Sequence, residues 1–420
     1  MKKYTRRIIW GIIIVLVVVF AGGIYYLYNA LAIGTGYSAK YLCSQVFLSD
    51  RDPDYIIEEE INPTNPLFAL VSSSIDRERK EVTSVGLGFL QDKTAVYREG
   101  FGCTLAVDRT REQLMQQVEG AVPSFKNSGE KLWPAGNMTD PASLPAGVDR
   151  EKIEKALDFA FMEENNGLPV RTQAVAVVYR GRLIAERYAD NITPQTRLLG
   201  WSMTKSITGT LVGLLVKDGK LDVGQPAPVK EWQQPDDPRS EITLDNLMRM
   251  NSGLAFEEVY GPMTDATEML YDSANMAAYA AAKPLAGEPG EKWHYSSGTT
   301  NILMRIIREK TGGSLVDVHR YLQQRLFKPL HMDSAVIEPD ASGNLVGSSY
   351  MFATARDWAR IGQFFLQNGR WEGRQLLPEG WIKYCTTPTP GSKEQYGAQI
   401  WLNPGTAGNE DIKRSYPRLP

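Results

Sequence analysis

Histidine is scarce in this chain of 420 residues, where it occurs only at His294, His319 and His331. This scarcity argues against a hydrolase that uses histidine as its base, and no serine lies in a G-x-S-x-G turn. The few histidines and cysteines also lack the spacing that is typical of a zinc site. The sequence therefore predicts neither a metal site nor another cofactor.

Cysteine is equally rare and occurs only at Cys43, Cys103 and Cys385. Three cysteines are too few for a framework of disulfides. One bridge, with Cys43–Cys103 as the favoured pair, would form if this part of the chain is exported. Three buried free thiols are an alternative of equal weight.

A large excess of charge of one sign is also absent. The net charge of −3 gives no indication of a nucleic-acid partner. The content of 43% hydrophobic and 23% charged residues is ordinary for a globular protein with a substantial core. The length allows one large domain or two or three smaller ones.

One long apolar segment is present, from Ile8 to Leu27. As a helix it would span about 30 Å, which matches the hydrocarbon core of a bilayer. Basic residues precede it, and Lys40 is the first charged residue after it. This asymmetry predicts a single-pass anchor in a bacterial inner membrane, with the remainder in the periplasm or outside the cell. The alternative is a signal peptide cleaved after Ala32, although the apolar segment is long for that role.

Composition and turn residues predict four segments along the chain. They are an anchor or signal (1–30), a small mixed α/β region (38–112), a linker (113–148) and a main domain (149–420). The linker is rich in proline, glycine, serine and asparagine, which is typical of a segment that runs over the surface.

Alternating apolar residues predict strands at 80–90 and 93–105, and a hairpin formed by 173–179 and 183–188. A further strand is expected at 396–401. Helices are expected at 149–165, 202–217, 243–250, 276–282, 300–309, 315–326 and 355–367. This order of elements indicates an α+β architecture rather than alternating βαβ units.

Ser202 and Lys205 have the spacing S-x-x-K. Apolar residues recur at helical spacing after them, so both side chains would lie on one face of the first turn of a buried helix. A serine becomes a useful nucleophile when a base takes its proton, and a desolvated lysine is one such base. The alternative is that Ser202 only caps the helix and that Lys205 is solvated.

Tyr295 lies within Trp293–Asn301, just before a second helix with an apolar face. A tyrosine at this position would act as general base and then general acid beside the Ser–Lys pair. Taken alone, it is more simply a packed aromatic residue.

With Ser202, Lys205 and Tyr295 in this order, the sequence resembles the class C-like branch of the serine β-lactamase/penicillin-binding-protein superfamily. Within that branch it is most similar to the esterases and the 6-aminohexanoate-dimer hydrolases. The resemblance runs from about residue 150 to the end, and further segments that carry it are 251–254, 287–290, 310–312 and 353–359.

The resemblance implies a β-lactamase/transpeptidase-like α+β fold, with an antiparallel sheet flanked by helices and a mostly helical subdomain. It also implies an acyl-enzyme mechanism in which Ser202 is the nucleophile, Lys205 its partner and Tyr295 the acid/base. The expected substrate is then a small molecule with an amide or ester bond.

Two features depart from the family pattern. β-Lactamases of this branch have asparagine two residues after the tyrosine, whereas this chain has Ser297, which favours the esterase-like members.

The family also has a third motif, K-T-G or H-x-G, on a strand that supplies a second oxyanion-hole N–H. We expect it after 396–401. Lys310-Thr311-Gly312 has this form, but it lies only fifteen residues after Tyr295 and ends an expected helix, and no such motif occurs between Trp401 and Pro420. We therefore expect a C-terminally incomplete domain, either a fragment or a truncated product, in which the 173–188 hairpin lacks partner strands.

Four residues are candidate substrate contacts: Ser297, Trp201 beside the nucleophile, and Tyr260 and Asp265 in an expected loop between the first two motifs. The alternatives are that Trp201 only packs against its neighbours, and that Tyr260 and Asp265 are solvated loop residues.

The sequence thus predicts a membrane-anchored serine hydrolase of amides or esters. One alternative is a catalytically inactive envelope protein that keeps the fold for binding. The other is a D,D-peptidase or β-lactamase. Export of the main domain favours this alternative, whereas Ser297 in place of the asparagine of β-lactamases disfavours it.

Overall fold

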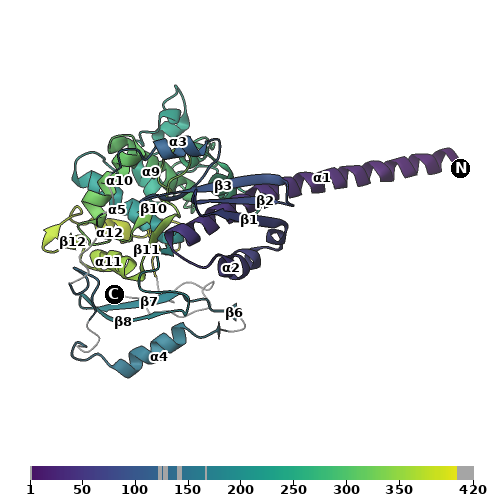
Figure 1. Cartoon of the computed structure of the whole chain (residues 1–420). Coiled ribbons are helices and arrows are strands. Elements are labelled where there is room, and N and C mark those ends of the chain that lie inside the picture. Colours follow the sequence, from purple (N-terminus) through teal and green to yellow (C-terminus); the bar gives the residue numbers. More distant parts are fainter. Residues whose placement is uncertain (1, 122–124, 126–130, 140–143, 166–167, 404–420) are drawn as a thin grey trace.

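The computed structural model describes residues 2–121, 125, 131–139, 144–165 and 168–403. Helix α1 (Lys2–Cys43) projects as a single long helix from the body of the protein (Figure 1). Its side chains are largely exposed as far as Tyr28 and largely buried from Ala30 onward. Its apolar part is long enough to cross a membrane. The predicted apolar helix is therefore confirmed, and it continues beyond Leu27 into the folded body.

An antiparallel sheet of four strands packs against the inner half of α1 (Figure 1). In spatial order, its strands are β1 (Val71–Asp76), β2 (Glu81–Gly86), β3 (Leu90–Arg98) and β4 (Gly102–Leu105). The prediction of one strand at 93–105 is wrong, because a turn divides it. In that turn Gly100 and Gly102 have φ values of 78° and 69°, which glycine adopts most easily. Strand β1 was not predicted.

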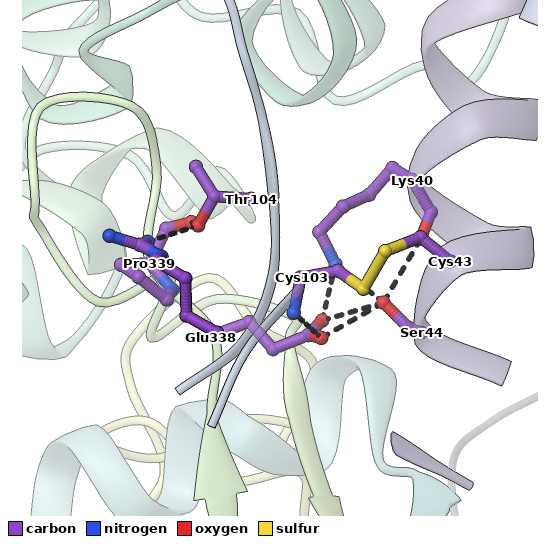
Figure 2. Close-up of a disulfide and its surroundings, with 8 residues drawn as sticks. Lys40, Cys43, Ser44, Cys103, Thr104, Glu338 and Pro339 are labelled. Carbon is purple, nitrogen blue, oxygen red and sulfur yellow. Dashed lines mark hydrogen bonds and ion pairs between the residues drawn. A yellow bond between two sulfur atoms is a disulfide. The ribbon is translucent and has the colours of Figure 1, made fainter. Parts of the chain in front are cut away.

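A disulfide between Cys43 and Cys103 joins the end of α1 to β4 (Figure 2). This confirms the favoured pairing over three free thiols. Cys385 is free and buried.

Glu338 is fully buried beside this disulfide (Figure 2). Its carboxylate accepts hydrogen bonds from the backbone N–H of Cys103 (2.6 Å) and from Ser44 Oγ (2.9 Å), and it forms an ion pair with Lys40. Lys40 lies on α1, Ser44 directly follows that helix and Cys103 lies on β4. The carboxylate of Glu338 therefore joins two segments that are distant from it in the sequence, the end of α1 and β4.

The body is mainly helical and surrounds α5 (Thr204–Lys217). Ile207, Leu211 and Leu214 of α5 are at most 1% exposed, which confirms the predicted apolar face. The other helices of the body are α3 (Arg111–Gln116), α6 (Leu244–Met248), α7 (Asp265–Asp272), α8 (Met276–Ala281), α9 (Ser297–Lys310), α10 (Leu315–Leu322), α11 (Ala355–Leu366) and α12 (Trp381–Thr386), while the short α2 (Pro53–Tyr55) follows α1.

A small antiparallel sheet leads into the S-x-x-K turn. Its central strand β11 (Met351–Ala353) pairs on one side with β10 (Val336–Ile337) and on the other with β9 (Leu198–Leu199). Strand β10 ends immediately before Glu338, and β9 ends three residues before Ser202. The sheet therefore connects the buried carboxylate with the candidate nucleophile. Two-residue pairs also form between β5 (Glu164–Asn165) and β6 (Leu168–Pro169), and between β12 (Arg370–Trp371) and β13 (Arg374–Gln375).

The predicted hairpin is confirmed as β7 (Ala174–Tyr179) and β8 (Arg182–Tyr188). It lies between α11 and α4 (Arg150–Ala160), as Figure 1 shows. Glu186 of β8 forms an ion pair with Arg356 of α11, and Arg187 forms one with Asp158 of α4 (2.7 Å). Among the described residues, the hairpin pairs with no other strand.

Three predictions for the main domain are wrong. The helix expected at 149–165 ends at Ala160, and Glu164–Asn165 is strand β5. The expected loop at Asp265 is the start of helix α7. The expected strand at 396–401 is a turn closed by a single bridge between Tyr396 and Trp401. Gln399 has a φ of 61° there, which is incompatible with a strand, and its side chain binds the backbone oxygen of Met248 (3.1 Å) and Thr300 Oγ1 (2.9 Å). Most of the segment that was expected to carry a third motif lies outside the described residues.

Replacement of both Cys43 and Cys103 by serine should lower the free energy of unfolding by about 4 kcal/mol, because the bridge closes a loop with a sequence separation of 60. Denaturant unfolding of the full chain in lipid nanodiscs measures this difference. A reductant should destabilise the parent by a similar amount and leave the double variant unchanged. A loss below 1 kcal/mol would contradict the expectation.

Candidate active site

Ser202 lies in a tight turn between β9 and α5. The 3₁₀ turn Trp201–Met203 precedes α5, so Ser202 stands at the N-terminal end of the helical segment. Trp201 has a φ of 42°, and a Cβ atom at Gly200 would lie 2.2 Å from the ring of Trp358. The chain therefore needs glycine at 200, and the turn presents the partly exposed Ser202 side chain to a cavity.

Lys205 is 1% exposed and touches Ser202. Its Nζ donates hydrogen bonds to Ser202 Oγ (3.3 Å), Ser297 Oγ (3.0 Å) and the backbone oxygen of Ser348 (3.0 Å). An ammonium group has three N–H donors, and three acceptors surround this one. The S-x-x-K motif and the segment that carries Tyr295 and Ser297 (the second motif) therefore meet at one buried amine.

Ser297 is the first residue of α9, and Glu258 holds it from the opposite side. The N–H and the hydroxyl of Ser297 donate to the two carboxylate oxygens of Glu258 (2.6 and 2.5 Å). A carboxylate is favoured at a helix N-terminus. Because the Ser297 hydroxyl proton is directed to Glu258, its oxygen is left to accept the proton of Lys205. The Tyr260 hydroxyl also donates to Glu258 (2.9 Å).

Glu258 is the residue of this site that the sequence analysis missed. It has no distinctive spacing from Ser202 or Tyr295, and it lies in an irregular segment next to a second glutamate, Glu257. Only the fold brings it to Ser297.

Tyr295 is adjacent to the pair through its ring rather than its hydroxyl. Lys205 Nζ lies 4.8 Å from the ring centroid, a cation–π distance. The hydroxyl is buried and has no hydrogen-bond partner among the described residues. The rings of Tyr396 (5.5 Å) and Trp401 (5.1 Å) pack against Tyr295, and burial raises the pKa of Tyr396 well above its ordinary value, which keeps that phenol neutral.

The other candidate substrate contacts do not all lie at the cavity beside Ser202. Trp201 and Tyr260 line the cavity at Ser202, and Trp201 also stacks on Tyr41 with ring centroids 6.2 Å apart. Asp265 lies outside this cavity and is engaged at the start of α7, where it pairs with Lys283 (2.5 Å) and accepts a hydrogen bond from the Tyr279 hydroxyl (2.9 Å).

The cavity beside Ser202 has a volume of about 460 Å³. Ser202, Trp201 and Tyr260 line it together with residues of α1 and of the segment before β1. Within the part of the chain that the structure describes, no group of three or more histidine, cysteine or acidic side chains is arranged to hold a metal ion. The arrangement of Ser202 and Lys205 is suited to nucleophilic attack assisted by an amine.

Comparison with known proteins agrees with the motifs. A family model described as Beta-lactamase matches residues 166–416. The 6-aminohexanoate-dimer hydrolase of Paenarthrobacter ureafaciens is 28% identical over 227 residues, which is 50% of this chain and 56% of that protein. The chain thus spans little more than half the length of that relative.

A solved structure of a candidate 6-aminohexanoate-dimer hydrolase from Bacillus anthracis is 24% identical, with a TM-score of 0.50 over 61% of this chain and 68% of that chain. This likeness establishes the β-lactamase/transpeptidase-like fold. The family model covers more than half of the sequence. The resemblance to this superfamily is thereby confirmed, and this chain belongs to the Beta-lactamase family.

Proposed function

We propose that this protein is a serine hydrolase that cleaves amide or ester bonds through an acyl-enzyme on Ser202. The single observation that supports it best is the contact of 3.3 Å between Ser202 Oγ and the buried Nζ of Lys205, at the wall of a cavity. The similarity to a 6-aminohexanoate-dimer hydrolase agrees with a substrate that contains an amide bond.

In this mechanism Lys205, in its neutral form, accepts the proton of Ser202 as Oγ attacks the carbonyl carbon. The N–H of Ser202 lies at the start of a helical segment and would stabilise the negative charge on the carbonyl oxygen. The leaving group departs with a proton, and water then releases the acid from Ser202. Tyr295, packed beside Lys205, is the proposed acid/base of these proton transfers.

We also propose that the catalytic body is outside the cytoplasm and stays attached to the membrane through α1. The Cys43–Cys103 disulfide supports an oxidising compartment. Leu31 and Ala32, at the alternative cleavage site, are 1% and 6% exposed within an unbroken helix. Cleavage there would cut through a packed part of the protein, so retention of the anchor is favoured.

Replacement of Ser202 by alanine should lower the turnover of p-nitrophenyl butyrate by at least about 10³-fold, because the covalent nucleophile is lost. The assay uses the full chain in nanodiscs, with labelling by a fluorophosphonate probe as a second measurement. The matched control is Ser206→Ala on the same helix, which removes only a hydrogen bond to the Gln399 backbone oxygen (3.1 Å). A Ser202→Ala rate within threefold of the parent would refute the mechanism.

Replacement of Glu258 by glutamine should lower kcat about tenfold and leave KM within about twofold. The amide cannot accept both Ser297 hydrogen bonds, and a bond to a charged acceptor contributes about 1.5–3 kcal/mol. Steady-state kinetics of Glu258→Gln, with Glu257→Gln as the exposed control, measure this. An unchanged kcat, or a loss that appears only with a lowered melting temperature, would remove Glu258 from the site.

A reporter that is active only after export should be active when it is fused after Gly36, and a reporter that is active only in the cytoplasm should be inactive there. Basic residues before the apolar segment keep the N-terminus inside. Mass spectrometry of the purified protein should find the segment before Ile33 retained. A mature N-terminus at Ile33 would show cleavage instead.

A further inference from the structure

The membrane helix forms part of the wall of the cavity at Ser202. Ala30, Leu31, Ile33, Gly34 and Tyr37 of α1 line this cavity together with Ser202 itself. They begin three residues after Leu27 and end ten residues after it. At a rise of 1.5 Å per residue, the cavity lies within about 15 Å of the apolar segment along the helix axis.

The position of the bilayer surface follows from the same helix. Tyr25, Tyr26 and Tyr28 are 63%, 49% and 49% exposed, and aromatic residues of this kind lie at membrane interfaces. The cavity begins within one turn of Tyr28. Ser202 is therefore held near the membrane surface rather than at the far end of the catalytic body.

Most of the residues that α1 and the segment 64–71 contribute to the lining of the cavity are apolar. Leu31 and Ile33 of the helix contribute to this wall, and so do Phe68 and Val71, which lie close to Gly34 of the same helix. Among the described residues that line the cavity, none is charged. A charged substrate group would lose its hydration here without gaining a partner, which is unfavourable. The volume of about 460 Å³ is within the range of about 300–1,000 Å³ of sites for small molecules.

From this geometry we propose that the substrate is a membrane amphiphile, an ester or amide of a long acyl chain, whose chain lies in the α1 cavity while its carbonyl meets Ser202. The inference rests on the serine hydrolase function proposed above and names its substrate class. The C–O or C–N bond of the substrate breaks, the acyl group bonds to Ser202 Oγ, and the leaving group takes the proton. Water then releases the fatty acid.

Two glycines of α1 provide a matched pair of variants. A Cβ atom at Gly34 would lie 3.6 Å from Val71 Cγ2 and 3.8 Å from Phe68 Cε1, which is ordinary contact, so a leucine there fills the cavity without a clash at its first atom. A Cβ atom at Gly23 would have nothing within 4 Å, and Gly23 lies in the apolar segment outside the cavity. Leucine is also the better helix former at both positions.

The test uses the full chain in phosphatidylcholine nanodiscs with p-nitrophenyl butyrate and p-nitrophenyl octanoate. Each buried methylene gains up to about fourfold in kcat/KM, so the octanoate should be at least tenfold better for the parent and for Gly23→Leu. Gly34→Leu should lose this preference, measured as the ratio of octanoate turnover to butyrate turnover. A parent that prefers butyrate, or a Gly34→Leu variant with an unchanged preference, would overturn the proposal.

A second measurement separates this proposal from the proposed catalytic function. An octanoyl ester with a diazirine near the end of its chain is photolysed with the Ser202→Ala variant, which cannot turn it over. Crosslinks to residues 30–37 and 64–71 are expected, and Gly34→Leu in the same background should reduce them at least fivefold. Crosslinks there without hydrolysis by the parent would refute only the catalytic function, and their absence would refute the acyl-chain site.

Discussion

The buried carboxylate of Glu338 is the contact on which the arrangement of this protein depends. It accepts the backbone N–H of Cys103 and the hydroxyl of Ser44, and it pairs with Lys40 (Figure 2). The approach is close enough that a Cβ atom at Gly102 would lie 2.4 Å from its Oε1 atom. A buried charge that loses one partner costs about 3–5 kcal/mol, so the end of α1, β4 and the segment after β10 are held as one unit.

This unit determines the surroundings of Ser202. Glu338 directly follows β10, which pairs with β11, and β11 pairs with β9 just before the S-x-x-K turn. Helix α1 and the candidate nucleophile are therefore connected through only a few short strands. The same docking brings the residues of α1 after Ala30 into the wall of the cavity. Helix α1 is therefore part of the wall of the site.

Hydrogen bonds around Lys205 organise the site itself. Lys205 is buried, and its three hydrogen bonds reach two serine hydroxyls and one backbone oxygen. The carboxylate of Glu258 lies one hydroxyl further away and accepts two hydrogen bonds from Ser297, the first residue of α9. Ser297 thus links Lys205 to the segment that carries Tyr295. The hydroxyl of Tyr295 does not make this link, because it is the ring of Tyr295 that lies over the amine.

The sequence by itself determined the elements with strong local signals. These are the apolar helix from Ile8, the helix after Ser202, the hairpin around residues 180–182 and the family that the motifs indicate. The spacing of three residues was enough to predict that Ser202 and Lys205 meet, although Ser202 lies in the 3₁₀ turn before α5 rather than on the helix itself. Only the tertiary structure decided that Glu258 holds Ser297, that Gln399 turns where a strand was expected, and that α1 lines the cavity. These contacts join residues far apart in the chain, and a local pattern of side chains carries no information about them, because the packing of whole elements sets them.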